Sequence, residues 1–221
     1  MRNLFLTGEN EARRAKSNPA RIMFLGFIAV ISMGTLLLML PVSSRSGAPV
    51  HVMTALFTSV SASCVTGLTV ADTALTWSLF GQIVILCLFQ IGGLGFMSVS
   101  TIFFFIMNKK INLSHRLLIM KSMSLRDVQG VVRLIRHVFI GTFIFEGIGA
   151  AVLWTRFLPE YGLWNGLGMG IFHSVSAFCN AGFDLLGSSG QSPGLAAYSG
   201  DAAVMITLML LVVVGGLGFF V

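Results

Sequence analysis

The chain has 221 residues, of which 55% are hydrophobic and only 10% are charged. With a mean hydropathy of +0.89, this composition excludes an ordinary soluble domain and predicts an integral membrane protein. The apolar runs along the chain make the expected fold all-α. The net charge of +6 does not indicate a nucleic-acid partner, because the basic residues gather in two segments instead of forming a groove-binding surface.

The first of these basic segments is residues 1–21, which hold five of the 14 Lys and Arg residues. The apolar run Ile22–Leu40 follows and has 19 residues. A signal peptide has a hydrophobic region of only about 7–15 residues, whereas about 20 are needed to cross a bilayer. We therefore expect a retained membrane helix that ends at Pro41, with the N-terminus in the cytoplasm.

An internal repeat dominates the sequence: residues 57–68 recur 115 residues later as residues 172–183. Each copy joins a short apolar segment to a polar, glycine-containing segment, with a longer apolar stretch on either side. Irregular backbone at membrane depth is tolerated only where it is buried in protein or lines a wet cavity. The pattern predicts two helix–pore loop–helix repeats, residues 22–107 and 138–221.

The short segments are expected to form half-length helices. The first covers residues 50–62, with Pro49 where the helix begins, and the second covers residues 166–178, with Asn165 as its N-cap. At about 1.5 Å per residue, neither helix is long enough to cross the membrane. The chain must therefore turn back, and Gly67 supplies the backbone freedom for the first reversal.

The first repeat closes with the apolar stretch Leu79–Met107, whose 29 residues exceed the bilayer core, so we expect it to tilt, bend or protrude. Its centre contains Gly92, Gly93 and Gly95. We interpret these glycines as sites of close helix packing and not as a nucleotide-binding loop, because no strand precedes them. The same Gly-Gly-Leu-Gly-Phe motif recurs in the second repeat at residues 215–219.

Residues 108–137 carry seven more basic residues and are predicted to be a cytoplasmic connection, whose helical apolar spacing suits either lipid headgroups or a cytoplasmic partner. The next span, Val138–Leu158, contains Glu146. An ionisable residue at that depth has either a functional role or a structural one, as a hydrogen-bond partner of a neighbouring loop. The final span is expected to begin near Ala202.

Some polar residues have two readings. The three cysteines, Cys64, Cys87 and Cys179, lack metal-ligand spacing, so they either pack beside the loops or, less simply, form a disulfide. On the presumed outer side the acids outnumber the bases and could concentrate cations, although Asp72 and Asp184 could equally be helix caps or loop anchors. The residues in this count are Asp72, Glu160, Asp184 and Asp201, against Arg45 and Arg156.

Three segments, residues 61–69, 89–96 and 173–183, closely resemble the Trk/Ktr/HKT superfamily of cation transporters, and within it the membrane subunits of Ktr potassium-uptake systems. The resemblance implies four repeats around one potassium-channel-like pore. Two are visible here, so we expect the chain to be an N-terminal half. The resemblance also assigns Gly67 and Gly182 to the selectivity filter, and glycine in place of serine at the first position accompanies potassium preference.

The implied function is potassium uptake across the plasma membrane through a filter of backbone carbonyl groups, which replace the hydration shell of the ion. The carboxyl ends of the two half-helices direct their negative dipole ends toward the same cavity. Na⁺ is a possible coupling or modulating ion. The expected potassium-binding residues are Val65, Thr66, Gly67, Leu68, Asn180, Ala181, Gly182 and Phe183.

The resemblance further implies a multi-pass protein in contact with membrane lipid, a homodimer of full-length subunits, and a cytoplasmic nucleotide-binding regulatory ring of the KtrA type. The alternative function is a structural or assembly subunit that does not itself conduct. An enzyme is not expected, because the spans offer Glu146 but no convergent set of titratable groups, and His51 and His173 have no Ser or Asp triad around them.

Overall fold

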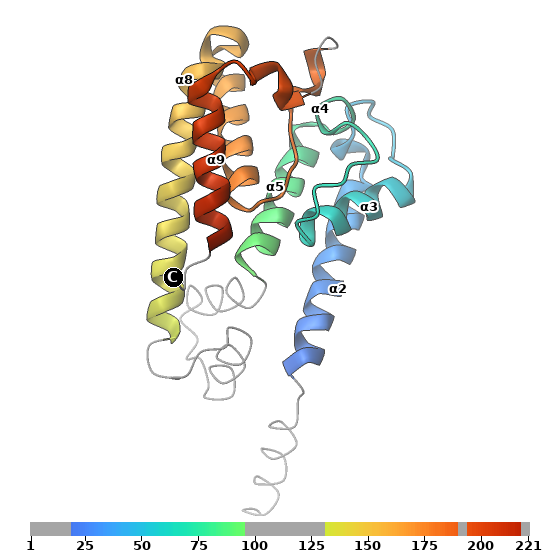
Figure 1. Cartoon of the computed structure of the whole chain (residues 1–221). Coiled ribbons are helices and arrows are strands. Elements are labelled where there is room, and N and C mark those ends of the chain that lie inside the picture. The colour runs from blue at the N-terminus through green and yellow to red at the C-terminus, as the bar shows by residue number, and fades with distance from the viewer. Residues whose placement is uncertain (1–18, 96–130, 190–193, 218–221) are drawn as a thin grey trace, which may run out of the picture. The chain divides into compact units, whose positions relative to one another are not determined.

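The computed structural model describes residues 19–95, 131–189 and 194–217, and within these ranges it is all-helical (Figure 1). An isolated bridge between Ser44 and Trp77 is the nearest approach to a strand there. The elements are α2 (Pro19–Leu38), η1 (Pro41–Ser43), α3 (Val52–Ser63), α4 (Thr73–Thr76), α5 (Leu79–Leu94), α8 (Val131–Phe178), η2 (Leu186–Ser189), η3 (Gly194–Tyr198) and α9 (Ala202–Leu217). The all-α prediction is confirmed for the described residues.

The chain divides into two compact units. One comprises Met1–Ala29 and Phe96–Arg136, of which the structure describes only the beginnings of α2 and α8. The other comprises Val30–Gly95 and His137–Val221 and holds both copies of the internal repeat. The predicted basic segments, residues 1–21 and 108–137, lie almost entirely outside the described residues, so their boundaries stay predictions.

The short helix of the first repeat, α3, has 12 residues and is therefore about 18 Å long. It begins at Val52, because the ring of His51 accepts a hydrogen bond from the amide of Met53 (3.3 Å) and caps the helix. The prediction that the helix begins at Pro49 is wrong, since Pro49 lies in the extended segment before this cap. The preceding helix, α2, ends at Leu38, two residues before the expected Leu40.

The apolar stretch from Leu79 does not continue as one helix through the described residues. Ser78 caps α5, whose last residue is Leu94, and Gly95 follows with a φ of 79°. Only glycine adopts this left-handed conformation without a steric penalty, so the third glycine of the motif ends the helix. The remainder of the predicted stretch, residues 96–107, lies outside the described residues.

Helix α8 is interrupted at Gly162, where φ is 76° and ψ is 180°. The interruption follows Pro159 and separates a long segment from a short one that ends at Phe178. The short segment therefore starts earlier than predicted, and Asn165, the expected N-cap, lies inside it. The final helix, α9, begins at Ala202 as expected.

Glycines bring the helices of each repeat together. A Cβ added to Gly34 in α2 would lie 2.5 Å from Oγ of Ser59, and one added to Gly149 in α8 would lie 2.6 Å from Oγ of Ser174. Gly92 in α5 and Gly215 in α9 are equally constrained, because an added Cβ would overlap the carbonyl oxygen of the last residue of the short helix that each one contacts. The two repeats thus pack in the same way.

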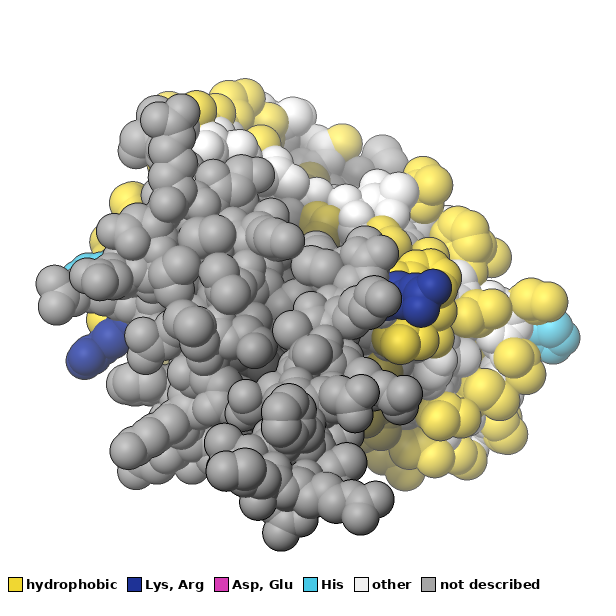
Figure 2. Space-filling model, turned by 90° about the horizontal axis from the view of Figure 1, so that it is seen from below, with side chains coloured by type: hydrophobic (Ala, Val, Ile, Leu, Met, Phe, Trp, Pro, Cys, Tyr) yellow, Lys and Arg dark blue, Asp and Glu magenta, His cyan; other side chains and the backbone are white. Residues whose placement is uncertain are grey.

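The described surface suits a lipid environment. Large apolar side chains are exposed along the helices, among them Leu36 (66%) in α2 and Phe143 (60%) in α8. In the view of Figure 2 the described side chains are mostly hydrophobic, with basic and histidine side chains but no acidic one in sight. By length and composition, one helical run among the described residues, Arg136–Phe178, is apolar enough to cross a membrane.

We expect Gly92→Ala to destabilise the protein by about 1–3 kcal/mol, because the new methyl group would push α5 away from α3. The measurement is thermal unfolding of the full-length protein in detergent. Gly147→Ala in α8 is the matched control, because nothing lies within 4 Å of the added Cβ, and it should leave the transition unchanged or raise it slightly. Equal transitions for both variants would contradict the close packing at Gly92.

Candidate functional site

The two repeated segments form irregular loops that follow the last residues of α3 and α8. Both loops have the same backbone signature: φ is 55° at Val65 and 75° at Gly67, and 57° at Asn180 and 71° at Gly182. Left-handed conformation is uncommon for a β-branched residue such as valine. Such outliers persist only where the surrounding structure enforces them, which makes these loops candidates for a functional site.

Hydrogen bonds inside each loop repeat at the same 115-residue offset. Oγ of Ser61 donates to the carbonyl oxygen of Leu68, and Oγ of Ser176 donates to that of Phe183, both at 2.7 Å. The amide of Thr66 donates to the carbonyl oxygen of Ser61 (2.9 Å). The hydroxyl of one serine in each short helix therefore holds the last residue of the loop that follows. The carbonyl oxygen of the same serine holds the start of the loop.

The loop of the second repeat has an additional anchor in His173, whose ring is buried. Its Nδ1 lies 2.8 Å from the carbonyl oxygen of Met169, and its Nε2 accepts a hydrogen bond from the amide of Leu185 (3.3 Å). The ring thus fixes the chain just after Phe183. Sequence analysis gave His173 no role, and the structure makes it a structural one.

The two loops lie against each other at their glycines. A Cβ added to Gly67 would lie 2.8 Å from the carbonyl oxygen of Ala181 and 3.3 Å from Cα of Gly182. The structure therefore brings the two predicted halves of the site together. A pocket of about 220 Å³ adjoins the second loop, and its lining includes Asn180 and Gly182.

The eight predicted site residues fall into two sets by the state of their carbonyl groups. The carbonyl oxygens of Leu68 and Phe183 accept the serine hydrogen bonds described above. Within the part of the chain that the structure describes, those of the other six accept no hydrogen bond and can meet an ion. These six are Val65, Thr66, Gly67, Asn180, Ala181 and Gly182.

Two of the acids on the presumed outer side have structural roles. Oδ1 of Asp72 accepts hydrogen bonds from the amides of Ala74 (2.8 Å) and Leu75 (2.9 Å) and caps α4, so its interpretation as a helix cap is confirmed. Asp184 packs against Gly194, where an added Cβ would overlap the carboxylate. This close approach suits a loop anchor.

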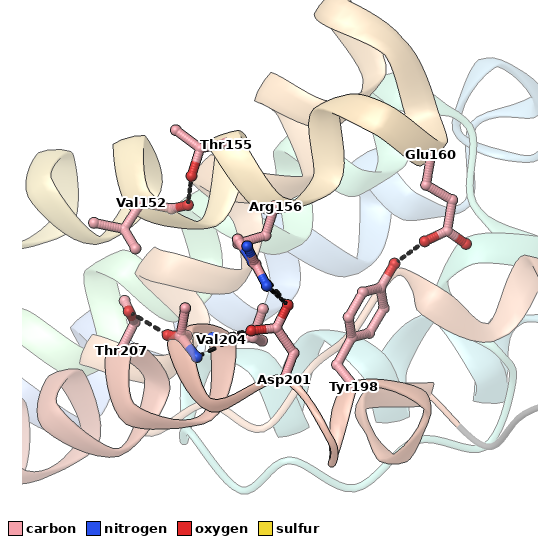
Figure 3. Close-up of polar contacts among 9 residues, drawn as sticks. Val152, Thr155, Arg156, Glu160, Tyr198, Asp201, Val204 and Thr207 are labelled. Atoms are coloured by element: carbon pink, nitrogen blue, oxygen red, sulfur yellow. Dashed lines mark hydrogen bonds and ion pairs between the residues drawn. The ribbon is translucent and has the colours of Figure 1, made fainter.

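Two further acids are paired, as Figure 3 shows. Arg156 of α8 forms an ion pair with Asp201, with Nη2 of Arg156 2.7 Å from Oδ2 of Asp201. Glu160 accepts a hydrogen bond from the phenol of Tyr198. The Arg156 and Asp201 charges therefore cancel locally, and the excess of acids over bases on this side comes from the other residues in the count.

Glu146 is 4% exposed and accepts hydrogen bonds from Nε2 of Gln90 in α5. Its backbone carbonyl oxygen accepts another from Oγ of Ser174 (2.7 Å) in the short helix. These contacts support the structural alternative for Glu146. Sequence analysis gave Gln90 no role, although it lies two residues before Gly92, the first glycine of the motif.

All three cysteines are free, so the disulfide alternative is wrong. No cluster of His, Cys, Asp and Glu among the described residues could hold a metal ion. The site therefore offers backbone oxygens, supported by serine hydroxyls and glycines, and no set of side chains for acid–base or nucleophilic chemistry in the described region.

Two loops of unpaired carbonyl groups in an all-α chain with exposed apolar helices suit the class of membrane proteins that bind cations. Residues 2–221 match the TrkH family, described as cation transport protein, and the chain belongs to this family. Members of this family are membrane transport proteins, in agreement with the expectation that the chain is not an enzyme.

Individual relatives agree with the family match. The chain is 42% identical to the potassium/sodium uptake protein NtpJ of Enterococcus hirae, over 94% of this chain and 45% of the relative. It is 40% identical to the Ktr system potassium uptake protein B of Bacillus subtilis, over 92% of this chain and 44% of the relative. It is 36% identical to the protein of the same description from Vibrio alginolyticus, over 100% of this chain and 47% of the relative. The chain thus spans less than half the length of these relatives.

The Arg156–Asp201 ion pair should make the stability of the folded protein depend on pH. The hydrogen bond from Arg156 holds the pKa of Asp201 below its ordinary value, so the stabilisation is present above that value, about 3.9, and is lost as the pH falls through the lower pKa of the folded state. We expect Asp201→Asn, which keeps an N-cap acceptor for Ala203, to unfold at a lower temperature than wild type at pH 7.

The difference in unfolding temperature between wild type and Asp201→Asn should shrink toward zero as the pH falls below about 3.9. The measurement is thermal unfolding of both proteins in detergent over a pH series. Arg156→Gln is the control, and in that background the Asn substitution should have little effect at any pH. A difference between wild type and Asp201→Asn that persists in acid would contradict the ion-pair explanation.

Proposed function

We propose that the protein takes up potassium across the plasma membrane through a channel-like pore, with a selectivity filter to which both loops contribute backbone carbonyl oxygens. The observation that carries the proposal is the matched geometry of the two loops, which approach each other at Gly67 and Gly182 with free carbonyl groups on either side. Membership of a cation transport family supports the same function.

The chemistry of the loops favours a weakly hydrated cation. Carbonyl oxygens replace water around the ion, and the serine hydrogen bonds at Leu68 and Phe183 keep the backbone in position. The short helices end at Ser63 and Phe178, so the negative ends of both helix dipoles adjoin the loops. These features stabilise positive charge without a carboxylate.

Potassium is the proposed transported ion, since relatives with 36–42% identity are named as potassium or potassium/sodium uptake proteins. The name of the Enterococcus hirae relative also supports Na⁺ as a coupling or modulating ion. In the full-length protein we expect four helix–pore loop–helix repeats around one pore, of which this chain supplies the first two.

We further propose a multi-pass subunit with a cytoplasmic N-terminus that forms a homodimer. A nucleotide-binding ring of the KtrA type would dock on the basic connection, residues 108–137. The charge asymmetry of the sequence supports the sidedness. A structural subunit without conduction is the second candidate, and the glycine-mediated helix packing favours it, but it leaves the paired loops of free carbonyl groups without a role.

The filter is tested by Gly67→Ser in the full-length protein. The side chain would meet the carbonyl oxygen of Ala181 and force a left-handed conformation on a residue with a Cβ, at a cost of about 1–2 kcal/mol. We expect discrimination of K⁺ over Na⁺ in uptake assays to fall by roughly tenfold. Gly47→Ser is the control, because Gly47 has a similar φ of 71° but nothing within 4 Å of an added Cβ.

Unchanged selectivity in Gly67→Ser, or an equal loss in Gly47→Ser, would count against the filter.

Sidedness is tested with single cysteines in a protein whose native cysteines have been replaced. A cysteine at Ser46, in the connection after η1, should react from outside intact cells with a membrane-impermeant thiol reagent. A cysteine at Ser114, in the basic connection, should react only after the cells are permeabilised. Labelling of the Ser114 variant in intact cells would refute the proposed topology.

A further inference from the structure

Glu146 is a buried carboxylate whose partner is an amide. Nε2 of Gln90 lies 2.9 Å from Oε1 and 3.2 Å from Oε2 of Glu146, and no described cationic side chain forms an ion pair with this residue. A buried carboxylate without a cation is costly, above all inside a membrane. Glutamate at this position therefore needs an explanation beyond packing.

Gln90 links Glu146 to the second loop. Because Nε2 of Gln90 donates to the carboxyl group of Glu146, the amide turns its Oε1 to the other side. There Oε1 accepts a hydrogen bond from the thiol of Cys179, with Sγ 3.7 Å away. Cys179 directly precedes Asn180, the first left-handed residue of the loop.

The backbone around this link is tightly packed. Gly93, three residues after Gln90, contacts Cys179 so closely that an added Cβ would lie 2.7 Å from its Sγ. The carbonyl oxygen of Glu146 also accepts the hydrogen bond from Ser174, in the short helix that ends beside Cys179. The last turn of this helix is therefore held between α5 of the first repeat and the long segment of α8.

The first repeat lacks this link and serves as an internal reference. Ile31 occupies the position of Glu146 there, and its carbonyl oxygen accepts the corresponding hydrogen bond from Ser59 (2.8 Å). Cys64 occupies the position of Cys179, is exposed and has no hydrogen bond from its thiol to any described residue. The backbone contact is thus common to both repeats, whereas the side-chain link belongs to the second loop alone.

We propose that Glu146 is a positioning residue: through Gln90 it orients the thiol of Cys179 and thereby fixes the start of the second loop, which sets the selectivity of the filter. This inference rests on the proposed potassium filter. In this role, Glu146 holds the side-chain amide of Gln90 in one of its two orientations. A single arrangement of the second loop is then favoured.

The experiment measures K⁺ and Na⁺ uptake by the full-length protein in proteoliposomes. Glu146→Leu leaves the Gln90 amide without its acceptor and should lower K⁺ over Na⁺ discrimination by roughly fivefold, the equivalent of one hydrogen bond of about 1 kcal/mol. Glu146→Gln keeps an acceptor oxygen and should restore most of the discrimination. A purely structural role would change the amount of folded protein and leave the ratio of the two ions unchanged.

The cysteines provide a matched pair that does not depend on the folding of the leucine variant. Cys179→Ala removes the last donor of the link and should lower discrimination, whereas Cys64→Ala, at the equivalent position of the first repeat, should not. The proposal is overturned if Glu146→Leu reaches the membrane with wild-type selectivity, if Glu146→Gln loses as much as Glu146→Leu, or if the two alanine variants behave alike.

Should Glu146→Leu fail to reach the membrane, the comparison of the two alanine variants decides. A wild-type protein that does not distinguish K⁺ from Na⁺ would overturn the proposed filter itself, and this inference with it. Normal discrimination in wild type with no effect of the variants would overturn only the role of Glu146.

Discussion

The candidate site depends on a turn of the chain after each short helix, and in each repeat one serine hydroxyl stabilises that turn. A backbone that leaves a short helix within a membrane exposes amide and carbonyl groups that lipid cannot satisfy. Ser61 and Ser176, which lie in the short helices, each satisfy one of these carbonyl groups by donating a hydrogen bond to Leu68 and Phe183, respectively. Because the loops are fixed at these points, the carbonyl groups between them stay available to an ion.

Glycine makes the remaining geometry possible. Where α5 and α9 pass the ends of the short helices, Gly92 and Gly215 allow backbone to meet backbone, and at Gly67 and Gly182 the absence of a side chain lets the two loops touch. Packing of this kind is driven by close contact and not by the hydrophobic effect, since lipid is as apolar as the helix surfaces. The glycines of the repeated motif are thus structural, as the sequence indicates.

The sequence indicated that the two repeated segments share one backbone course, because the repeat places the same small and polar residues at a fixed offset and the left-handed residues of the two segments match. It could not predict which side chains meet across helices. The contact between Gln90 and Glu146 joins residues 56 positions apart and depends on how two helices are rotated against each other, which apolar periodicity does not determine.

The errors at helix starts have a local cause. Pro49 and Asn165 are plausible first residues by composition, yet the ring of His51 caps α3 and the left-handed Gly162 sets the start of the second short helix. A histidine is an unusual cap, and a glycine conformation cannot be read from its neighbours. Likewise, a count of charges did not reveal that Arg156 pairs with Asp201.

The contact between Gly93 and Cys179 is heterologous: it joins a patch on the inner helix of one repeat to a different patch, at the end of the short helix, on the other. Among the described residues, the equivalent positions of the two repeats do not form the same contact with each other. Gly216, the counterpart of Gly93, meets only the amide of Asn180 at 3.6 Å, and Cys64, the counterpart of Cys179, is exposed. Contacts of this type are not self-complementary, so this one places the two repeats in a head-to-tail order.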